Sequence, residues 1–373
     1  GRTVVVITGH GNNGADGRVT ARLLADQGVR VNVIDAEHMP LRLPVSDLII
    51  DAAFGTGFRG EWSPPSTKGV PVLAVDIPSG IDGLTGLAAP DTWQATRTVT
   101  FVALKPGLLL GAGRALCGEV ELVDIGINLG MGNVDINEVE RSDVSQWVPQ
   151  RPFDSHKWKA ALYAVAGSSG MMGAANLCSA SAMRAGAGIV HVASPGIVSD
   201  RSTSTEIVRR ALPALGWSHE VLDDLSRFKA IVIGPGLGRD EGTVSETRRI
   251  IAGAHIPTVI DGDGLFAVAW GGEGARDIVR SRAAGTVLTP HDGEYTTLLG
   301  YAPSHDRITS ARRLASDTNC VCLLKGTTTV VAEPSGEVLM VANGDQRLAT
   351  AGTGDVLAGI IGALLAQGVE PFH

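Results

Sequence analysis

A glycine-rich stretch near the end of the chain, residues 348–365, holds the residue best suited to acid–base chemistry. It begins with small residues and one acid, Asp355, and continues as an apolar run of Ala, Leu and Ile. This pattern predicts a turn containing Gly352 and Gly354, with backbone conformations closed to other residues, that enters a buried helix. The free N–H groups at such a helix start bind anions, so a phosphate held there would lie beside Asp355. The carboxylate could then remove a hydroxyl proton. The alternative is a capped core helix with Asp355 as a first-turn acid.

Three segments of the first half, residues 3–8, 47–51 and 72–76, are short apolar runs typical of buried strands. The polar residues at their ends are Asn12, Asn13 and Asp16, then Asp51, then Asp76 and Ser79. Because the carboxyl ends of parallel strands meet at one edge of a sheet, these residues predict one shared site. Their oxygen atoms suit a cation, and Asp76 is the candidate acid or base. Each strand-end aspartate alone could equally be a helix cap or a turn former.

The second half repeats this arrangement. Predicted strands cover residues 161–166, 230–233, 258–261, 285–288 and 322–325. Lys325 and the threonine-rich turn after it suit phosphate, through a point charge, backbone N–H groups and hydroxyls. Asp261 and Asp263 either cap a helix or bind Mg²⁺. His291 follows a proline turn and is either a structural histidine or a ligand-binding one.

Strands that alternate with glycine turns and helices predict an α/β fold with mostly parallel sheets. The chain has 373 residues, enough for two domains, and its 48 glycines fit many tight turns. The strand–turn–helix rhythm stops between residues 129 and 153, which predicts a linker over residues 130–152. We therefore expect domains over residues 1–135 and 150–373.

Composition excludes several classes of partner. The net charge of −8 disfavours nucleic acid as a ligand, and no apolar run is long enough to span a membrane. No signal peptide is visible, and the four cysteines show neither metal-ligand spacing nor a favourable disulfide geometry, so a reducing cytoplasm is expected. Because Gly1 opens almost directly into a predicted strand, we also expect an upstream segment to be missing from this sequence. The cysteines are Cys117, Cys178, Cys320 and Cys322.

The first half resembles the YjeF N-terminal family, the NAD(P)HX epimerases, in four motifs: residues 11–17 (GNNGADG), 51–57 (DAAFGTG), 75–80 (VDIPSG) and 100–107 (TFVALKPG). This family interconverts the R and S forms of hydrated NADH and NADPH. The resemblance implies a Rossmann-like domain and a potassium ion held by Asn13, Asp51 and Ser79. It implies substrate contacts at Asn12, Asn13, Gly14, Ala15, Asp16, Gly55, Thr56, Gly57, Phe58, Arg59, Gly60, Glu61 and Asp76. Ala15 stands where the family has a glycine.

The second half resembles the ADP- or ATP-dependent NAD(P)HX dehydratases of the ribokinase-like fold. The motifs are residues 166–174 (AGSSGMMGA), 234–238 (GPGLG), 289–294 (TPHDGE), 325–329 (KGTTT) and 351–355 (AGTGD). The resemblance implies contacts with hydrated NADH at Ala174, Gly236, Gly238, His291 and Asp355. It implies contacts with ADP or ATP at Lys325, Gly326, Thr327, Thr328, Thr329 and Gly354.

Together the two resemblances predict a bifunctional repair enzyme for NADHX and NADPHX, with K⁺ and Mg²⁺ as ions and an adenine nucleotide as co-substrate. The first domain would epimerise; the second would phosphorylate the ring hydroxyl and then expel phosphate to restore NAD(P)H. One alternative is a ribokinase-like kinase for a small molecule, with an accessory N-terminal domain. In another, the first domain only binds a nucleotide or a protein. The sequence does not decide between ADP and ATP, between NADHX and NADPHX, or between a monomer and a homo-oligomer.

Overall fold

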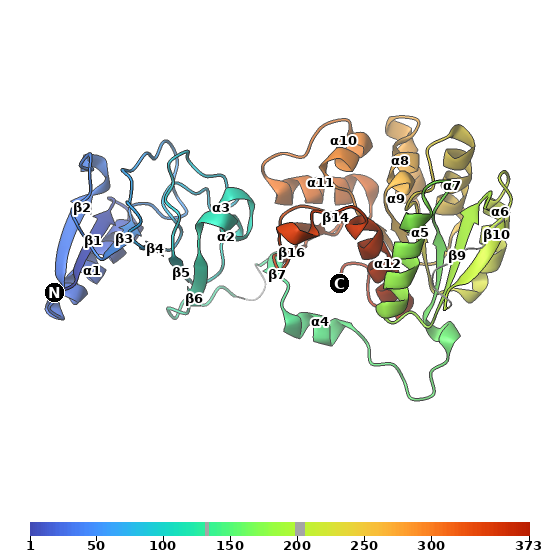
Figure 1. The fold of residues 1–373 in the computed structure, drawn as a ribbon, viewed down its shortest axis with the longest axis horizontal. Coiled ribbons are helices and arrows are strands. Elements are labelled where there is room, and N and C mark those ends of the chain that lie inside the picture. The colour runs from blue at the N-terminus through green and yellow to red at the C-terminus, as the bar shows by residue number, and fades with distance from the viewer. Residues whose placement is uncertain (131–133, 198–205) are drawn as a thin grey trace. The chain divides into compact units, whose positions relative to one another are not determined.

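The computed structural model describes residues 1–130, 134–197 and 206–373, and the chain forms two compact units, Gly1–Val134 and Asp135–His373 (Figure 1). In its described residues, the first unit holds a six-stranded parallel sheet in the order β2-β1-β3-β4-β5-β6. The order of these strands reverses between β1 and β3, the point at which open α/β sheets bind ligands. The strands are β1 (Thr3–Thr8), β2 (Arg30–Asp35), β3 (Leu48–Ala52), β4 (Val72–Val75), β5 (Arg97–Phe101) and β6 (Glu119–Val123). The helices are α1 (Asn12–Asp26), η1 (Ala36–His38), α2 (Pro106–Leu109) and α3 (Gly111–Leu116).

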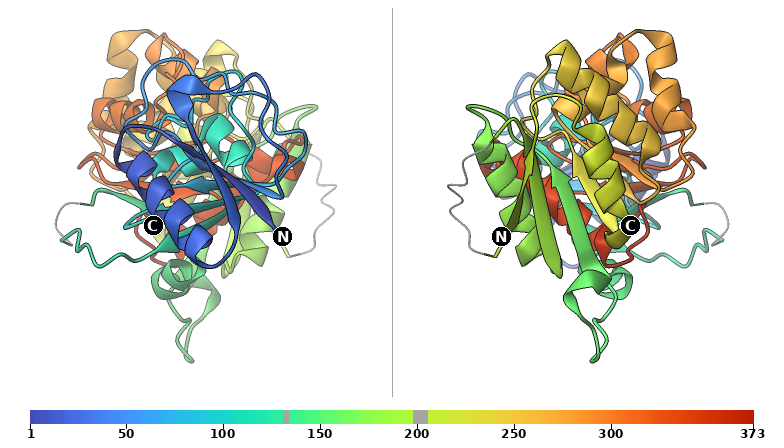
Figure 2. Two further views of the ribbon diagram at one scale, coloured as in Figure 1. Left: turned by 90° about the vertical axis from the view of Figure 1, so that its left-hand side faces the viewer. Right: turned by 90° about the vertical axis from the view of Figure 1, so that its right-hand side faces the viewer.

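The two faces of this sheet are covered differently, because successive strand residues point to opposite sides. Val4 and Val6 pack with Ala21 of α1, which runs along one face (Figure 2). Val5 and Ile7 pack on the other face among loop residues that include two buried tryptophans, Trp62 and Trp93. One face of the sheet is therefore covered by a helix and the other mainly by loops, which leaves the strand ends to shape a site.

In the described residues, the second unit holds a ten-stranded sheet in the order β10-β9-β8-β11-β12-β13-β14-β15-β16-β7. Its neighbours are parallel except where β15 pairs antiparallel with β14 and β16, as expected for a mostly parallel sheet. The strands are β7 (Ile136–Glu138), β8 (Ala161–Val165), β9 (Ile189–Pro195), β10 (Val208–Leu212), β11 (Ala230–Ile233), β12 (Thr258–Ile260), β13 (Thr286–Leu288), β14 (Val321–Leu324), β15 (Thr329–Ala332) and β16 (Val338–Val341). The helices are α4 (Arg141–Trp147), η2 (Lys157–Ala160), α5 (Met172–Arg184), α6 (Ser218–Asp224), η3 (Leu225–Arg227), α7 (Glu241–Gly253), α8 (Asp263–Ala269), η4 (Glu273–Arg276), α9 (Asp277–Arg280), α10 (Asp292–Leu299), α11 (Arg307–Thr318), η5 (Gln346–Leu348) and α12 (Thr353–Ala366).

The buried helix predicted after the glycine turn is α12, which packs against α5 and the centre of the sheet. The two helices approach closely at Gly359, where a Cβ would lie 2.0 Å from the carbonyl oxygen of Cys178. Gly352 caps α12 with φ +89°, as the turn prediction requires. Gly354, by contrast, is an ordinary helical residue of the first turn, so its backbone does not need glycine.

The predicted linker over residues 130–152 is wrong where the structure shows a strand and a helix, β7 and α4. β7 lies inside this segment and pairs with β16, and the next residue, Val139, is buried in the core of the second unit. α4 follows, while residues 131–133 lie outside the described residues. The strand Ile136-Asn-Glu is too short and polar to be predicted from its own residues. It forms the edge of the sheet by pairing with β16, which comes much later in the chain.

Two further expectations concern α1 and the cysteines. Asn12 and Asn13, which the sequence places after the first strand, are the first two residues of α1. The four cysteines, all within the described residues, are buried and free of disulfides, as expected. Among the described helices, none combines the length and the apolar character that a membrane span requires.

Candidate active sites

The first unit contains a cavity of about 870 Å³ at the carboxyl ends of its strands. Nine of the predicted contact residues line it: Asn12, Asn13, Asp16, Gly55, Thr56, Gly57, Phe58, Arg59 and Asp76. The other four, Gly14, Ala15, Gly60 and Glu61, are not among its lining residues. Gly14 is buried and allows α1 to pack closely on residue 9, because a Cβ there would lie 1.8 Å from the carbonyl oxygen of Gly9. Ala15 is exposed, so its methyl group is accommodated where the family has a glycine.

Asp76 is paired with a lysine that the sequence reasoning did not single out. Lys105 Nζ lies 2.6 Å from Asp76 Oδ1, and both side chains are only 18% exposed. The ammonium also donates to Thr100 Oγ1 at 2.8 Å and to the carbonyl oxygen of Phe101 at 2.9 Å, so its three protons are all used. Lys105 lines the cavity as well. Its only sequence signal was its place in the motif of residues 100–107, which gave no hint of its partner.

The backbone is strained on both strands beside this ion pair. Asp76 follows β4 with φ +71°, and Val102 follows the neighbouring β5 with φ +69°. A β-branched residue such as valine almost never adopts this conformation, and such strain is concentrated at functional sites. Both residues line the cavity, which marks this edge of the sheet as a built site.

A second acidic group, Asp51, lies fully buried at the end of β3. Burial raises the pKa of its carboxyl group, although hydrogen bonds from the hydroxyl and amide of Ser79, at 2.5 and 2.8 Å, oppose this effect. The amide side chain of the buried Asn13 has no hydrogen-bond partner among the described residues. A buried carboxylate, a hydroxyl and an unsatisfied amide oxygen are the donor set of a hard cation, so the three residues fit the K⁺ that the resemblance implies.

The second unit brings Lys325 between two acids, Asp261 directly after β12 and Glu294 in the first turn of α10. Lys325 Nζ lies 2.9 Å from Asp261 Oδ1 and 3.6 Å from Glu294 Oε2. The same Asp261 oxygen accepts from the hydroxyl of Thr289 at 2.7 Å. A Cβ on Gly354 would lie 3.5 Å from Lys325 Nζ, so the start of α12 adjoins the lysine.

Asp355 lies in the first turn of α12, as predicted, and its environment disfavours the charged form. Burial raises the pKa of its carboxyl group, Asp261 and Asp263 raise it further, and Lys325 lowers it. Such a shift towards neutrality is typical of a carboxylate that takes up a proton during catalysis. Asp355, Asp261 and Asp263 thus form a cluster with Lys325. When phosphate is bound, a cation would balance the negative charge of this cluster.

The remaining predicted contacts with hydrated NADH in the second unit lie at two places: at the glycine turn of residues 234–238 and at the start of α10. Gly236 and Ala174 adjoin each other, because a Cβ on Gly236 would lie 2.9 Å from the Cβ of Ala174. Asp263 accepts from the backbone N–H of Gly238 at 2.8 Å, which fixes that turn. His291 caps α10 through Nδ1, which accepts from the N–H groups of residues 293 and 294, and its side chain is 60% exposed. The histidine is thus structural at Nδ1, and its Nε2 lies 3.5 Å from Glu294 Oε2.

The turn of residues 325–329 joins β14 to β15 and is supported by a residue that the sequence did not reveal. Arg307, the first residue of α11, donates to the carbonyl oxygen of Lys325 at 2.7 Å and pairs with Asp292 at 2.9 Å. No motif contains Arg307, so only the folded chain shows its contact with this turn.

Known proteins resemble this chain in both units. The family described as NAD(P)H-hydrate dehydratase matches residues 162–373, and the family described as YjeF-related protein N-terminus matches residues 1–44 and 34–107. The bifunctional NAD(P)H-hydrate repair enzyme Nnr of Moorella thermoacetica is 34% identical, and that of Mycobacterium tuberculosis H37Rv is 36% identical. Each alignment covers 99% of this chain and 80% of the relative. A solved ribokinase-like superfamily protein of Enterococcus faecalis matches with a TM-score of 0.53 and 23% identity, over 65% of this chain and 83% of that one.

Proposed function

Because this chain belongs to the family of bifunctional NAD(P)H-hydrate repair enzymes, we propose that it carries out both steps of that repair, one in each unit. The substrates are the hydrated forms of NADH and NADPH. The single observation that supports this division most strongly is that in each unit an aspartate directly after a strand pairs with a lysine, Asp76 with Lys105 and Asp261 with Lys325. Asp355, at the start of α12, is close enough to Lys325 for the lysine to lower its pKa. The protein would work in the cytoplasm, where its four unpaired cysteines stay reduced.

In the first unit, Asp76 is proposed to move the proton that inversion at the hydroxyl-bearing ring carbon requires. Lys105 holds the carboxylate in place, since its ammonium nitrogen lies 2.6 Å from Asp76 Oδ1. The cavity around the pair is large enough for a nucleotide. Asn13, Asp51 and Ser79 would hold K⁺, whose charge would stabilise negative groups of the substrate.

In the second unit, Asp355 is proposed to accept the proton of the ring hydroxyl while that oxygen attacks the terminal phosphorus of ADP or ATP. The bond from this phosphorus to the bridging oxygen breaks, and AMP or ADP leaves. Lys325 and the turn of residues 326–329 would hold the nucleotide phosphates through charge and hydrogen bonds. The new phosphate ester then breaks at its carbon–oxygen bond, a ring proton is lost, and NAD(P)H and free phosphate are released. Asp261, Asp263 and Glu294 offer the oxygen ligands that would hold Mg²⁺, which would neutralise phosphate charge.

The proposal is tested by incubating the protein with separated R and S epimers of NADHX and with ADP or ATP. We expect the S epimer to yield NADH and free phosphate in equal amounts, and the R epimer to do so after conversion to S. Chromatography and the absorbance of reduced nicotinamide follow both steps. A stable phosphorylated product without NADH would instead identify a small-molecule kinase, and dehydration without epimerisation would leave the first unit as a binding module.

A further inference from the structure

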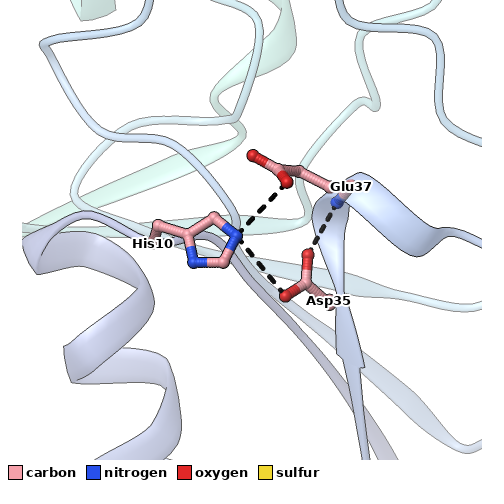
Figure 3. A group of neighbouring side chains, drawn as sticks. All are labelled: His10, Asp35 and Glu37. Carbon is pink, nitrogen blue, oxygen red and sulfur yellow. Dashed lines mark hydrogen bonds and ion pairs between the residues drawn. The ribbon is translucent and has the colours of Figure 1, made fainter.

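A cluster of three side chains lies outside the residues assigned so far. His10 Nε2 is 3.4 Å from Glu37 Oε2 and 3.7 Å from Asp35 Oδ2, and the three side chains point towards one another (Figure 3). Asp35 Oδ1 accepts from the backbone N–H of Glu37 at 2.8 Å, which fixes the start of η1. Among the described residues, no lysine or arginine forms an ion pair with either acid.

The position of the two acids in the fold indicates their ligand. Asp35 is the last residue of β2 in a unit of strand, glycine turn, helix and strand. An acid about 20 residues after the glycine turn, at the end of the second strand, accepts hydrogen bonds from the adenosine ribose in dinucleotide-binding units of this kind. Asp35 and Glu37 satisfy that spacing relative to Gly14.

One of these acids, Glu37, lines the cavity that contains Asp76, and Asp35 lies two residues before it, outside the lining. His10 and Glu37 line this cavity together with Asp76, Lys105 and the buried, unpartnered Asn13. The sheet order places β2 three strand spacings from β4, a distance of about 14 Å. A dinucleotide with its hydrated ring at Asp76 would therefore direct its adenosine half towards Glu37.

We propose, on the basis of the epimerase function above, that Asp35 and Glu37 bind the adenosine ribose and make the first unit select NADHX over NADPHX. Free ribose hydroxyls donate to carboxylates, which stabilises bound NADHX. The additional 2′-phosphate of NADPHX has no hydroxyl to donate and is repelled by two negative charges. Among the described residues, the basic side chains within ion-pair distance of these two acids are His10 and His38. Loss of hydrogen bonds to charged acceptors corresponds to about tenfold to a hundredfold in kcat/KM.

The test uses the full chain with the double substitution Asp35→Asn and Glu37→Gln. Asn keeps an oxygen for the N–H of residue 37, so η1 is retained, and both charges are lost. We expect the unaltered protein to epimerise NADHX at least about tenfold more efficiently than NADPHX, and the double variant to bring the ratio of kcat/KM close to one. Asp26→Asn, which removes an exposed charge at the end of α1, is the matched control and should leave the ratio unchanged.

Binding of ADP-ribose and 2′-phospho-ADP-ribose gives a second readout that needs no catalysis. The same order of affinities in the unaltered protein, and its loss in the double variant, support the inference even if no epimerisation occurs and the proposed function fails. Equal use and equal binding of both forms by the unaltered protein would overturn the inference while the epimerase function stands. A preference that reverses when Mg²⁺ is added would also overturn it, because the three side chains would then hold an ion.

Discussion

Replacing Asp76 with asparagine isolates the proposed acid–base step of the first unit. Asp76 has φ +71°, a conformation that asparagine tolerates better than most residues, so Asp76→Asn adds little backbone strain. Alanine would be a poorer test because its left-handed backbone is less favourable. The amide oxygen can still accept a hydrogen bond from Lys105, but the side chain can no longer transfer a proton.

The structure allows both effects of this change to be sized. Loss of a general acid–base group costs about 10²–10⁴ in rate, or roughly 3–5 kcal/mol in the activation barrier. Both side chains of the ion pair between Asp76 and Lys105 are 18% exposed, so the pair is intermediate between a solvent-exposed pair and a fully buried one. We therefore expect the free energy of unfolding to fall by about 1–2 kcal/mol, which lowers the unfolding temperature by a few degrees.

The assay follows conversion of R-NADHX to S-NADHX by chromatography, beside thermal unfolding of the same samples. Dehydration of S-NADHX with ADP or ATP should be unchanged, since the second unit performs it. Asp26→Asn serves as the control for loss of one charge. An R-to-S rate within about threefold of that of the unaltered protein would refute the acid–base role of Asp76, because loss of a proton-transferring group slows a reaction far more than this.

Three further predictions concern the second unit, the domain boundary and the cation. Asp355→Asn should abolish dehydration while ADP still binds, and should raise the unfolding temperature. Burial raises the pKa of Asp355, so ionising this carboxyl group costs stability as pH rises above the range of an unfolded aspartate. Thermal melts at several pH values should therefore show a larger loss of stability in the unaltered protein than in the variant, which keeps the buried Asp51. Persistent dehydration would leave Asp355 as a helix cap. A fragment of residues 135–373 should dehydrate S-NADHX and melt at a higher temperature than a fragment of residues 153–373, which lacks β7, and equal melting would remove β7 from the stable unit. Dialysis into a buffer without K⁺ should slow epimerisation, with recovery on adding KCl, and leave dehydration unchanged; full epimerisation without K⁺ would reject the cation site.

Much of the architecture could be predicted because it rests on local patterns. The β-branched runs of residues 3–8 and 230–233 become buried strands, since such side chains pack well on a pleated sheet. The glycine at 352 takes the left-handed conformation expected of the turn, and the apolar run after it becomes α12. Polar residues at strand ends also converge as expected, because parallel strands bring all their carboxyl ends to one edge.

What the sequence alone determined is therefore the strands with the clearest apolar runs, the glycine turns and the acids at strand ends, because each depends on residues close in the chain. The tertiary structure decided the partners: Lys105 for Asp76, Lys325 for Asp261 and β16 for β7. These pairs depend on which strands are neighbours in the sheet, and local spacing carries no information about that order. The pairing of acidic and basic side chains in each site, on which its proposed chemistry rests, therefore depends on contacts between segments that only folding brings together.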